Sequence, residues 1–173
     1  MRARTFWTVM AADESGAIER LVQRLADLHA DYCVVGGQAV NAYVEPLVSL
    51  DLDLAIAGAE LHRILPAFAS DFRIEHFTHS VNLEADNSDL RVQFQLDPRY
   101  AAFVPRAEHR PVLGVTLLVA KLEDVLQGKI WAVLDPARRA SKRQKDLADI
   151  SRILEKYPYL RPVVPAEVLA RLL

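Results

Sequence analysis

The stretch Tyr32-Cys-Val-Val-Gly-Gly-Gln-Ala-Val-Asn41, followed after a short connection by Ser49-Leu-Asp-Leu-Asp-Leu-Ala-Ile56, decides the fold of this chain. The first apolar run ends in Gly36 and Gly37, which is typical of a buried strand that enters a tight turn. Neither glycine carries a Cβ, so the backbone at this turn can approach a ligand closely. The residues from Gln38 to Tyr43 then predict the first turns of a helix.

The second run alternates between apolar and acidic residues and predicts another strand. Its leucines share one face, and Asp51 and Asp53 share the other. Two carboxylates this close repel one another unless a cation lies between them, and Mg²⁺ prefers such oxygen ligands together with bound phosphates. A half-solvated edge strand after an ordinary turn is the structural alternative. The order and proximity of the glycines and aspartates favour a phosphate and metal site.

Length and composition favour one cytoplasmic globular domain. The chain has 173 residues, 51% of them hydrophobic, and no apolar run approaches the roughly 20 residues that span a bilayer. The basic N-terminus lacks the apolar segment of a signal peptide. The single cysteine, Cys33, lies inside an apolar run, so we expect no disulfide and a reducing compartment.

Charge is distributed unevenly although the net charge is only −2. Residues 1–99 hold 8 Lys/Arg and 15 Asp/Glu, a balance of −7, whereas residues 100–173 hold 13 and 8, a balance of +5. An acidic half that carries candidate metal ligands, facing a basic half, is the distribution that a metal–nucleotide site would use.

The remaining patterns predict an α+β (or α/β) domain with a small mixed sheet flanked by helices. Strands are expected at 72–77, 81–84 and 90–96; helices are expected from Asp13 or Ser15 to Ala30, and at 58–69, 100–107, 120–134, 138–156 and 165–173. We expect a core over residues 1–115 and a helical C-terminal part over 116–173, packed on that core.

A dense basic run opens the helix expected at 138–156. It contains Arg138, Arg139, Lys142, Arg143 and Lys145. A solvated helix start is the ordinary interpretation of such a run. Cations at a helix N-terminus nevertheless oppose the helix dipole, so an anionic partner would relieve the arrangement. Asp146 and Asp149, on the same helix, could pair with these cations or hold Lys129.

The order Gly36-Gly37, Asp51-x-Asp53, Lys129 and Lys145-Asp146-x-x-Asp149-Ile150 resembles the minimal nucleotidyltransferase fold, over about residues 30 to 157. The glycines and paired aspartates are features of the whole superfamily. The later lysines and aspartates are most similar to AbiEii-type nucleotidyltransferase-like proteins of type IV toxin–antitoxin systems.

The resemblance implies a site for Mg²⁺ and a nucleoside triphosphate, ATP or another. It implies that Asp51 and Asp53 bind the metal and that Lys129 contacts the phosphates, with Asp146 or Asp149 as the acidic group of the later helix. The catalytic set is then Asp51, Asp53, Lys129 and Asp146; the nucleotide-binding set is Gly36, Gly37, Gln38, Ser49, Lys129, Arg139, Lys142, Lys145 and Asp149.

Two positions depart from the family pattern. Leu47 and Ser49 stand where the family commonly has Arg and Thr before the first aspartate. Active members also supply a third carboxylate from a later strand, and the matching positions here are Gln93 and Gln95. An amide binds metal only weakly and cannot take a proton at neutral pH. Glu84 or Asp97 could substitute for it.

The leading hypothesis is therefore a protein that binds Mg–NTP and transfers a nucleotidyl group to an RNA, such as tRNA, or to a protein hydroxyl. The alternative is a catalytically degenerate nucleotide- or RNA-binding module on the same fold. A third hypothesis is a toxin-like protein that requires a cognate antitoxin. A metal-dependent hydrolase would more often bring histidines into the motif.

Overall fold

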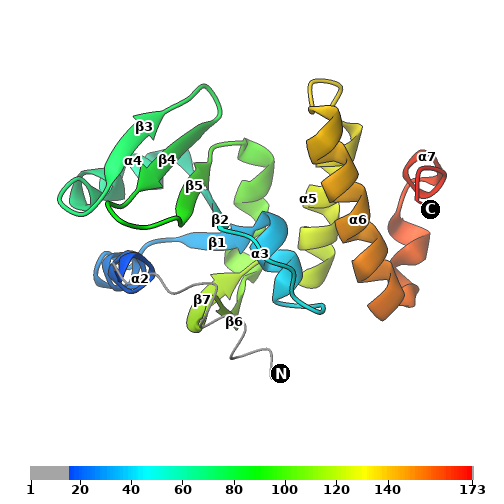
Figure 1. Ribbon diagram of the computed structural model, residues 1–173, viewed down its shortest axis with the longest axis horizontal. Helices are drawn as coiled ribbons and strands as arrows, with labels where there is room; N and C mark the ends of the chain where they lie inside the picture. The colour runs from blue at the N-terminus through cyan, green and yellow to red at the C-terminus, as the bar shows by residue number, and fades with distance from the viewer. Residues whose placement is uncertain (1–15, 173) are drawn as a thin grey trace.

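The computed structural model describes residues 16–172 of the chain, and Figure 1 shows a sheet-containing half beside a helical half. The expected helix caps Asp13 and Ser15 lie outside the described residues. The helices are α2 (Ala17–Asp27), α3 (Gly36–Asn41), α4 (Gly58–Ile64), α5 (Leu122–Leu134), α6 (Ala140–Lys156) and α7 (Ala166–Leu169), and 3₁₀ turns lie at Leu65–Phe68 (η1), Pro98–Ala102 (η2), Val104–Arg106 (η3) and Pro158–Val163 (η4). Among the described residues, no helix is both long and apolar enough to cross a bilayer.

Seven strands form one mixed sheet in the order β3-β4-β5-β2-β1-β7-β6. They are β1 (Tyr32–Val35), β2 (Asp51–Ile56), β3 (Arg73–His76), β4 (Ser80–Glu84), β5 (Arg91–Gln95), β6 (Glu108–Val112) and β7 (Val115–Val119). The strand that carries the aspartates, β2, lies near the middle, antiparallel to β1 and parallel to β5. The predicted class, a mixed sheet flanked by helices, is confirmed.

The two faces of β2 and its neighbours have opposite character. Leu52 and Leu54 of β2 and Phe94 of β5 are fully buried, and the Phe94 ring lies 5.9 Å from that of Phe68 in η1. Burial of these side chains contributes about 1.5–3 kcal/mol each. The opposite face of the same strands is polar and carries Asp51 and Asp53. The apolar face therefore anchors the strand while the polar face stays available for chemistry.

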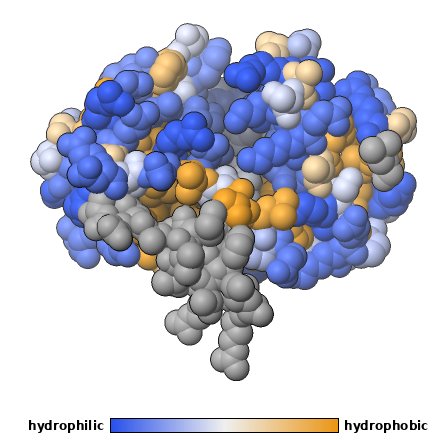
Figure 2. Space-filling model, viewed as in Figure 1, coloured by the Kyte–Doolittle hydropathy of each residue, from blue (hydrophilic) through white to orange (hydrophobic). Residues whose placement is uncertain are grey.

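The helical half consists of α5 and α6, which pack against one another and against α3, with η4 and α7 beyond α6 (Figure 1). Figure 2 shows the surface hollowed between the two halves at the top of the view. The strand β7, at residues 115–119, pairs with β1, so the sheet continues up to Val119 and the helical part begins at Leu122.

The sequence patterns missed or misplaced several features. No strand was expected at β7, and residues 116–119, assigned to the helical C-terminal part, belong to the sheet. The helix expected at 165–173 is the short α7. No strand was expected at β6, because Pro111 interrupts a run of charged residues; the structure tolerates this proline because β6 is an edge strand. The helix expected at 100–107 is instead two 3₁₀ turns, each with a proline in its first positions. The helix expected at 58–69 ends at Ile64 and continues as η1. The helix expected from Gln38 already begins at Gly36.

Candidate active site

The turn from β1 into α3 is shaped around a carboxylate. Gly36 has φ +67°, which side-chain-bearing residues rarely adopt, and a Cβ placed on it would lie 2.3 Å from Oδ2 of Asp53. Only glycine allows this close approach. The neighbouring Gly37 is less constrained, because a Cβ there would meet only Oγ of Ser49, at 4.0 Å. Gly36 therefore lies against the aspartate strand, and the position of the glycine pair beside a triphosphate stays a prediction.

The two aspartates of β2 share the polar face but differ in surroundings. Asp51 forms an ion pair with Arg91 of β5, with 2.9 Å between Oδ1 and Nε. Asp53 accepts a hydrogen bond from the side-chain amide of Gln95 at 3.4 Å. Burial raises the pKa of Asp53 and Asp51 adds to the effect, whereas Gln95 and Lys129 oppose it. A cation bound at this pair would favour the ionised form of Asp53.

A cavity of about 130 Å³ opens beside Asp53, between the sheet and α5. Its walls bring together residues from β1, α3, β2, β5, η2, α5, α6 and the connection between α5 and α6. They are Val35, Gly36, Asp53, Gln95, Tyr100, Asp124, Val125, Gly128, Lys129, Ala132, Arg138 and Asp146. Gly36, Asp53, Lys129 and Asp146 of the sequence-derived set thus meet in one place.

Lys129 lies in this wall and forms ion pairs with two carboxylates. Its side chain is 8% exposed, and its Nζ lies 2.9 Å from Oδ1 of Asp146 and 2.7 Å from Oδ2 of Asp149. Burial alone would lower the pKa of Lys129, but the two carboxylates outweigh it and the pKa is raised. Lys129 is therefore a charged hub that joins α5 to α6.

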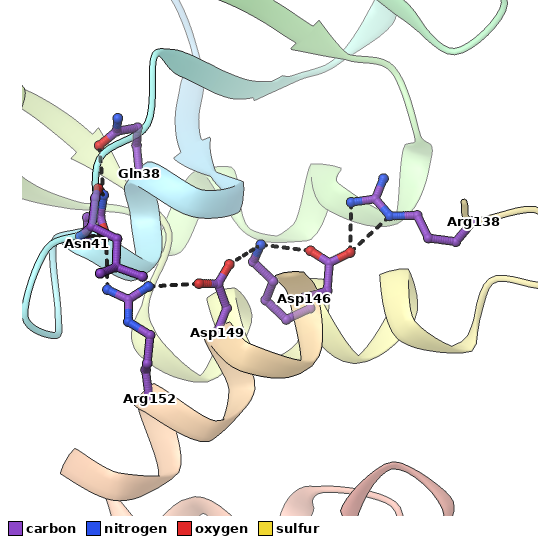
Figure 3. A network of polar contacts seen from close by, with 8 residues as sticks. Gln38, Asn41, Arg138, Asp146, Asp149 and Arg152 are labelled. Atoms are coloured by element: carbon purple, nitrogen blue, oxygen red, sulfur yellow. Dashed lines mark hydrogen bonds and ion pairs between the residues drawn. The ribbon is translucent and has the colours of Figure 1, made fainter. Parts of the chain in front are cut away.

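Figure 3 shows that this hub belongs to a longer polar network. On one side, Arg138 contacts Asp146 through Nε and Nη2 at 2.9 and 2.8 Å. On the other, Arg152 pairs with Asp149 at 2.8 Å and donates to Oδ1 of Asn41 on α3 at 3.1 Å. The network runs from the cavity wall to the end of α3.

The network continues into the segment that leads to the aspartates. Asn41 bonds both the backbone nitrogen and the carbonyl of Leu47, and the buried Gln38 donates to the Ser49 carbonyl at 2.6 Å. Arg152 also donates to the carbonyl of Glu45. Gln38, which the sequence assigned to the nucleotide, here holds the backbone just before Asp51.

Two members of this network, Asn41 and Arg152, were missed by sequence reasoning. Only the three-residue spacing of Asp149 and Arg152 on one helix gave a signal, and such pairs are common on helix surfaces.

The basic residues at the start of α6 divide into two groups. Arg138 lines the cavity, whereas Arg139, Lys142 and Lys145 are exposed and do not line it. None of these three makes an ion pair with another residue of 16–172. Lys142 and Lys145 precede Asp146 and Asp149 by one helical turn, which places them on the same side of α6.

No third carboxylate of residues 16–172 forms a ligand cluster with Asp51 and Asp53. Asp124 and Asp146 line the cavity, but they pair with Arg106 and Lys129. In residues 16–172 no three acidic, histidine or cysteine side chains cluster as metal ligands. Gln93 is in register with Asp53, and Gln95 reaches it directly. Glu84 instead pairs with Arg73, and Asp97 caps η2 and pairs with Arg99. The donor set still fits Mg²⁺, which proteins commonly hold through one or two carboxylates together with substrate phosphates.

An aromatic wall that sequence reasoning missed closes the cavity on one side. The Tyr100 ring lies against Gly128 of α5, where a Cβ would meet it at 3.2 Å. Burial raises the pKa of Tyr100 to about 12, so its hydroxyl stays protonated. Glycine has a low helix propensity and by itself weakens α5. Gly128 is nevertheless needed there, because it allows η2 to pack closely on α5.

Comparison with solved structures places the fold among nucleotidyltransferases. The solution structure of the antibiotic-resistance factor ANT(2'')-Ia is similar to this chain (TM-score 0.59, 12% identity, 93% of this chain and 94% of that chain). Its crystal structure with adenylyl-2''-tobramycin also matches (TM-score 0.60, 12% identity, 89% and 95%). So does an antigenic nucleotidyltransferase-like protein from Paracoccidioides brasiliensis (TM-score 0.53, 18% identity, 84% and 76%).

No protein-family model matches the sequence, and neither does any curated protein. The chain has a nucleotidyltransferase-like fold, shown by structure and not by sequence identity.

Proposed function

We propose that this chain binds a Mg²⁺–nucleoside triphosphate at Asp51 and Asp53 and transfers a nucleotidyl group to an acceptor hydroxyl. One observation carries the proposal: Gly36 leaves room for the Asp53 carboxylate at the edge of a cavity that also contains Lys129 and Arg138. A carboxylate whose pKa is raised, beside a second carboxylate on the same strand face, gains most from a bound cation. The fold of the structural neighbours supports the same reaction class.

Each residue has a separate role in this proposal. Asp51 and Asp53 hold the metal, and Arg91 must release Asp51 for that purpose; its side chain is 66% exposed and free to move away. Arg138 and the exposed Lys142 and Lys145 attract the phosphates. Mg²⁺ bound there would offset the negative charge of the phosphate oxygens.

The transfer itself is a substitution at the α-phosphorus. The acceptor oxygen bonds to that phosphorus, the bond from phosphorus to the bridging oxygen breaks, and pyrophosphate leaves with the electron pair. The hydroxyl proton passes to solvent, because the amide of Gln95 cannot accept it. The residues of the chain contribute by orientation and by charge.

A second candidate function is nucleotide or RNA binding without transfer. The observation that favours it is the Gln95 amide, which contacts Asp53 where active relatives were expected to place a third carboxylate. The acceptors suggested by the sequence, tRNA, another RNA or a protein hydroxyl, belong to the transfer proposal. The narrower likeness to AbiEii-type proteins, and with it a partner antitoxin, stays a prediction from sequence.

Label transfer separates the two functions. The purified chain is incubated with Mg²⁺ and each α-³²P-labelled nucleoside triphosphate in the presence of an extract that contains RNA, protein and small molecules. Incorporated label together with released pyrophosphate, both abolished in Asp53→Asn, supports transfer. Nucleotide binding without incorporation would favour the binding module, and equal incorporation by Asp53→Asn would contradict the assigned site.

A further inference from the structure

The segment between α3 and β2, residues 42–50, leads directly to Asp51 and contains neither helix nor strand. Its Leu47 and Val48 side chains are 54% and 45% exposed, so burial of apolar surface does little to fix the course of its second half. Hydrogen bonds hold that half instead, because Asn41 bonds both the backbone nitrogen and the carbonyl of Leu47.

The second half of α6 holds the same segment from the other side. Arg152 donates to Oδ1 of Asn41 at 3.1 Å and also to the carbonyl of Glu45. One helical turn later, Lys156 donates to the carbonyl of Tyr43 at 2.6 Å. Polar contacts therefore tie the helical half of the molecule to the residues that precede the aspartate strand.

Arg152 differs from Lys156 because it also belongs to the network that reaches the cavity. In Figure 3 its guanidinium lies between Asn41 and Asp149, and it is 2.8 Å from the Asp149 carboxylate. Asp149 pairs in turn with Lys129, which lines the cavity. The Arg152 side chain is only 17% exposed. A planar guanidinium can hold several acceptors in a fixed geometry, which a lysine ammonium does less well.

The proposed nucleotide site needs two groups of side chains at a set separation. The carboxylates lie on β2, which is fixed in the sheet because it pairs with β1 on one side and β5 on the other. The cations lie in the helical half: Arg138 precedes α6, and Lys142 and Lys145 belong to its first turns. In the proposed function a Mg²⁺–triphosphate contacts both groups, so its affinity depends on how well their separation is set before it binds.

We infer that Arg152 is a positioning residue, which fixes the cations at the start of α6 relative to the aspartates of β2. The inference rests on the proposed function. Arg152 does not line the cavity. It acts through Asn41 and Glu45 on the segment before Asp51, and through Asp149 on the wall of the cavity. A ligand that contacts only the aspartates gains little from this arrangement.

Titrations followed by ¹⁵N NMR, which registers millimolar affinities, test the inference with two nucleotides. The labelled chain is titrated with Mg²⁺ and α,β-methylene ATP, which cannot be cleaved between its α- and β-phosphorus, and with Mg²⁺ and AMP. The triphosphate reaches both groups of side chains, whereas AMP lacks the β- and γ-phosphates that extend to α6.

In Arg152→Gln we expect the affinity for the triphosphate to fall about tenfold and the affinity for AMP to change less than about twofold. Amide shifts in residues 45–50 should accompany the loss, because the segment loses its bond to the guanidinium. A residue that only stabilises the fold would not alter the preference for the triphosphate, since its loss changes the folded fraction alike for both nucleotides.

Two further variants separate position from charge. Arg152→Lys keeps a cation beside Asp149, so the chain should melt at nearly the wild-type temperature, with a triphosphate affinity between those of wild type and Arg152→Gln. This variant carries the test if Arg152→Gln does not fold. Arg161→Gln removes an exposed arginine of η4 with the same change in charge. It is the matched control and should bind both nucleotides normally.

The outcomes are distinguishable. A loss confined to the triphosphate supports the inference. Equal losses for the two nucleotides, wild-type affinities in Arg152→Gln, or the same loss in Arg161→Gln overturn it and leave the proposed function standing. A wild-type chain that binds neither nucleotide removes the proposed function and the positioning role with it.

Discussion

At the scale of single residues, Asp53 shows a conflict between stability and function. It is close to Asp51, and burial raises its pKa in the folded chain. The folded state therefore holds a proton at pH values where the unfolded state has lost it. Stability falls as pH rises from the ordinary aspartate pKa, about 3.9, through the folded value, and stays lower above it. A group that lowers stability in this way is typical of a functional site.

Asp53→Asn should consequently stabilise the metal-free chain at neutral pH, because it removes a carboxylate that folding disfavours while keeping an oxygen for Gln95. We expect the variant to melt at a higher temperature than the wild type at pH 7, and this difference in melting temperature should vanish below about pH 3.9. We also expect its Mg-dependent affinity for nucleotide to fall by more than about tenfold. Thermal unfolding at several pH values and calorimetry measure the three quantities. A lower melting temperature at pH 7 would show that Asp53 is structural.

Gln95→Glu should restore a third carboxylate to the site. Gln95 already reaches Asp53, so a glutamate there would lie close to the proposed metal position. We expect tighter Mg²⁺ binding and, if proton removal limits transfer, a rate about 10²-fold higher. Arg91→Gln is the companion variant, since it frees Asp51 without adding charge at Gln95. No gain in metal affinity from Gln95→Glu would place the metal elsewhere.

At the scale of elements, the β1–α3 turn packs closely on the strand β2, because Gly36 leaves the space beside the Asp53 side chain. The sequence identified both, because alternation on a strand and a glycine pair after an apolar run are local signals. The structure adds that Asp53 lies where a Cβ of Gly36 would be, while the contact of Gly36 with a triphosphate stays a prediction. Which partner occupies such a space depends on tertiary packing, and local patterns carry no information on that.

Gly36→Ala tests this packing. The new Cβ would clash with Asp53 at 2.3 Å, and the left-handed backbone adds about 1–2 kcal/mol of strain. We expect a loss of stability of roughly 2 kcal/mol or more and loss of Mg-dependent nucleotide binding. Gly58→Ala is the matched control, since a Cβ at the first residue of α4 meets nothing within 4 Å. Equal effects of the two substitutions in chemical denaturation would refute the role of Gly36.

The contact between α5 and α6 depends on Lys129. Lys129→Met would leave Asp146 and Asp149 buried with less compensating charge, and removal of one partner of a buried pair costs about 3–5 kcal/mol. Adding Asp149→Asn to Lys129→Met should recover part of that loss. Urea denaturation measures both variants. A Lys129→Met chain of normal stability but weak triphosphate binding would support the phosphate role implied by the sequence.

At the scale of the whole molecule, periodicity predicted the fold class and most elements, since strands and helices of ordinary length carry strong local signals. The edge strand β6 was missed because edge strands tolerate proline and charge. The polar network of Figure 3 joins residues more than 100 positions apart, such as Asn41 and Arg152, and no pattern in a single sequence reveals such pairs.

The central claim, a metal-dependent nucleotide site at Asp51 and Asp53, is tested most directly by calorimetric titration of the purified chain with ATP, GTP, CTP and UTP, each with and without Mg²⁺. The account predicts that at least one triphosphate binds only with Mg²⁺, and that Asp53→Asn abolishes this binding while the chain stays folded. Binding that is independent of Mg²⁺, or that persists in Asp53→Asn, would contradict it, as would the absence of binding by all four.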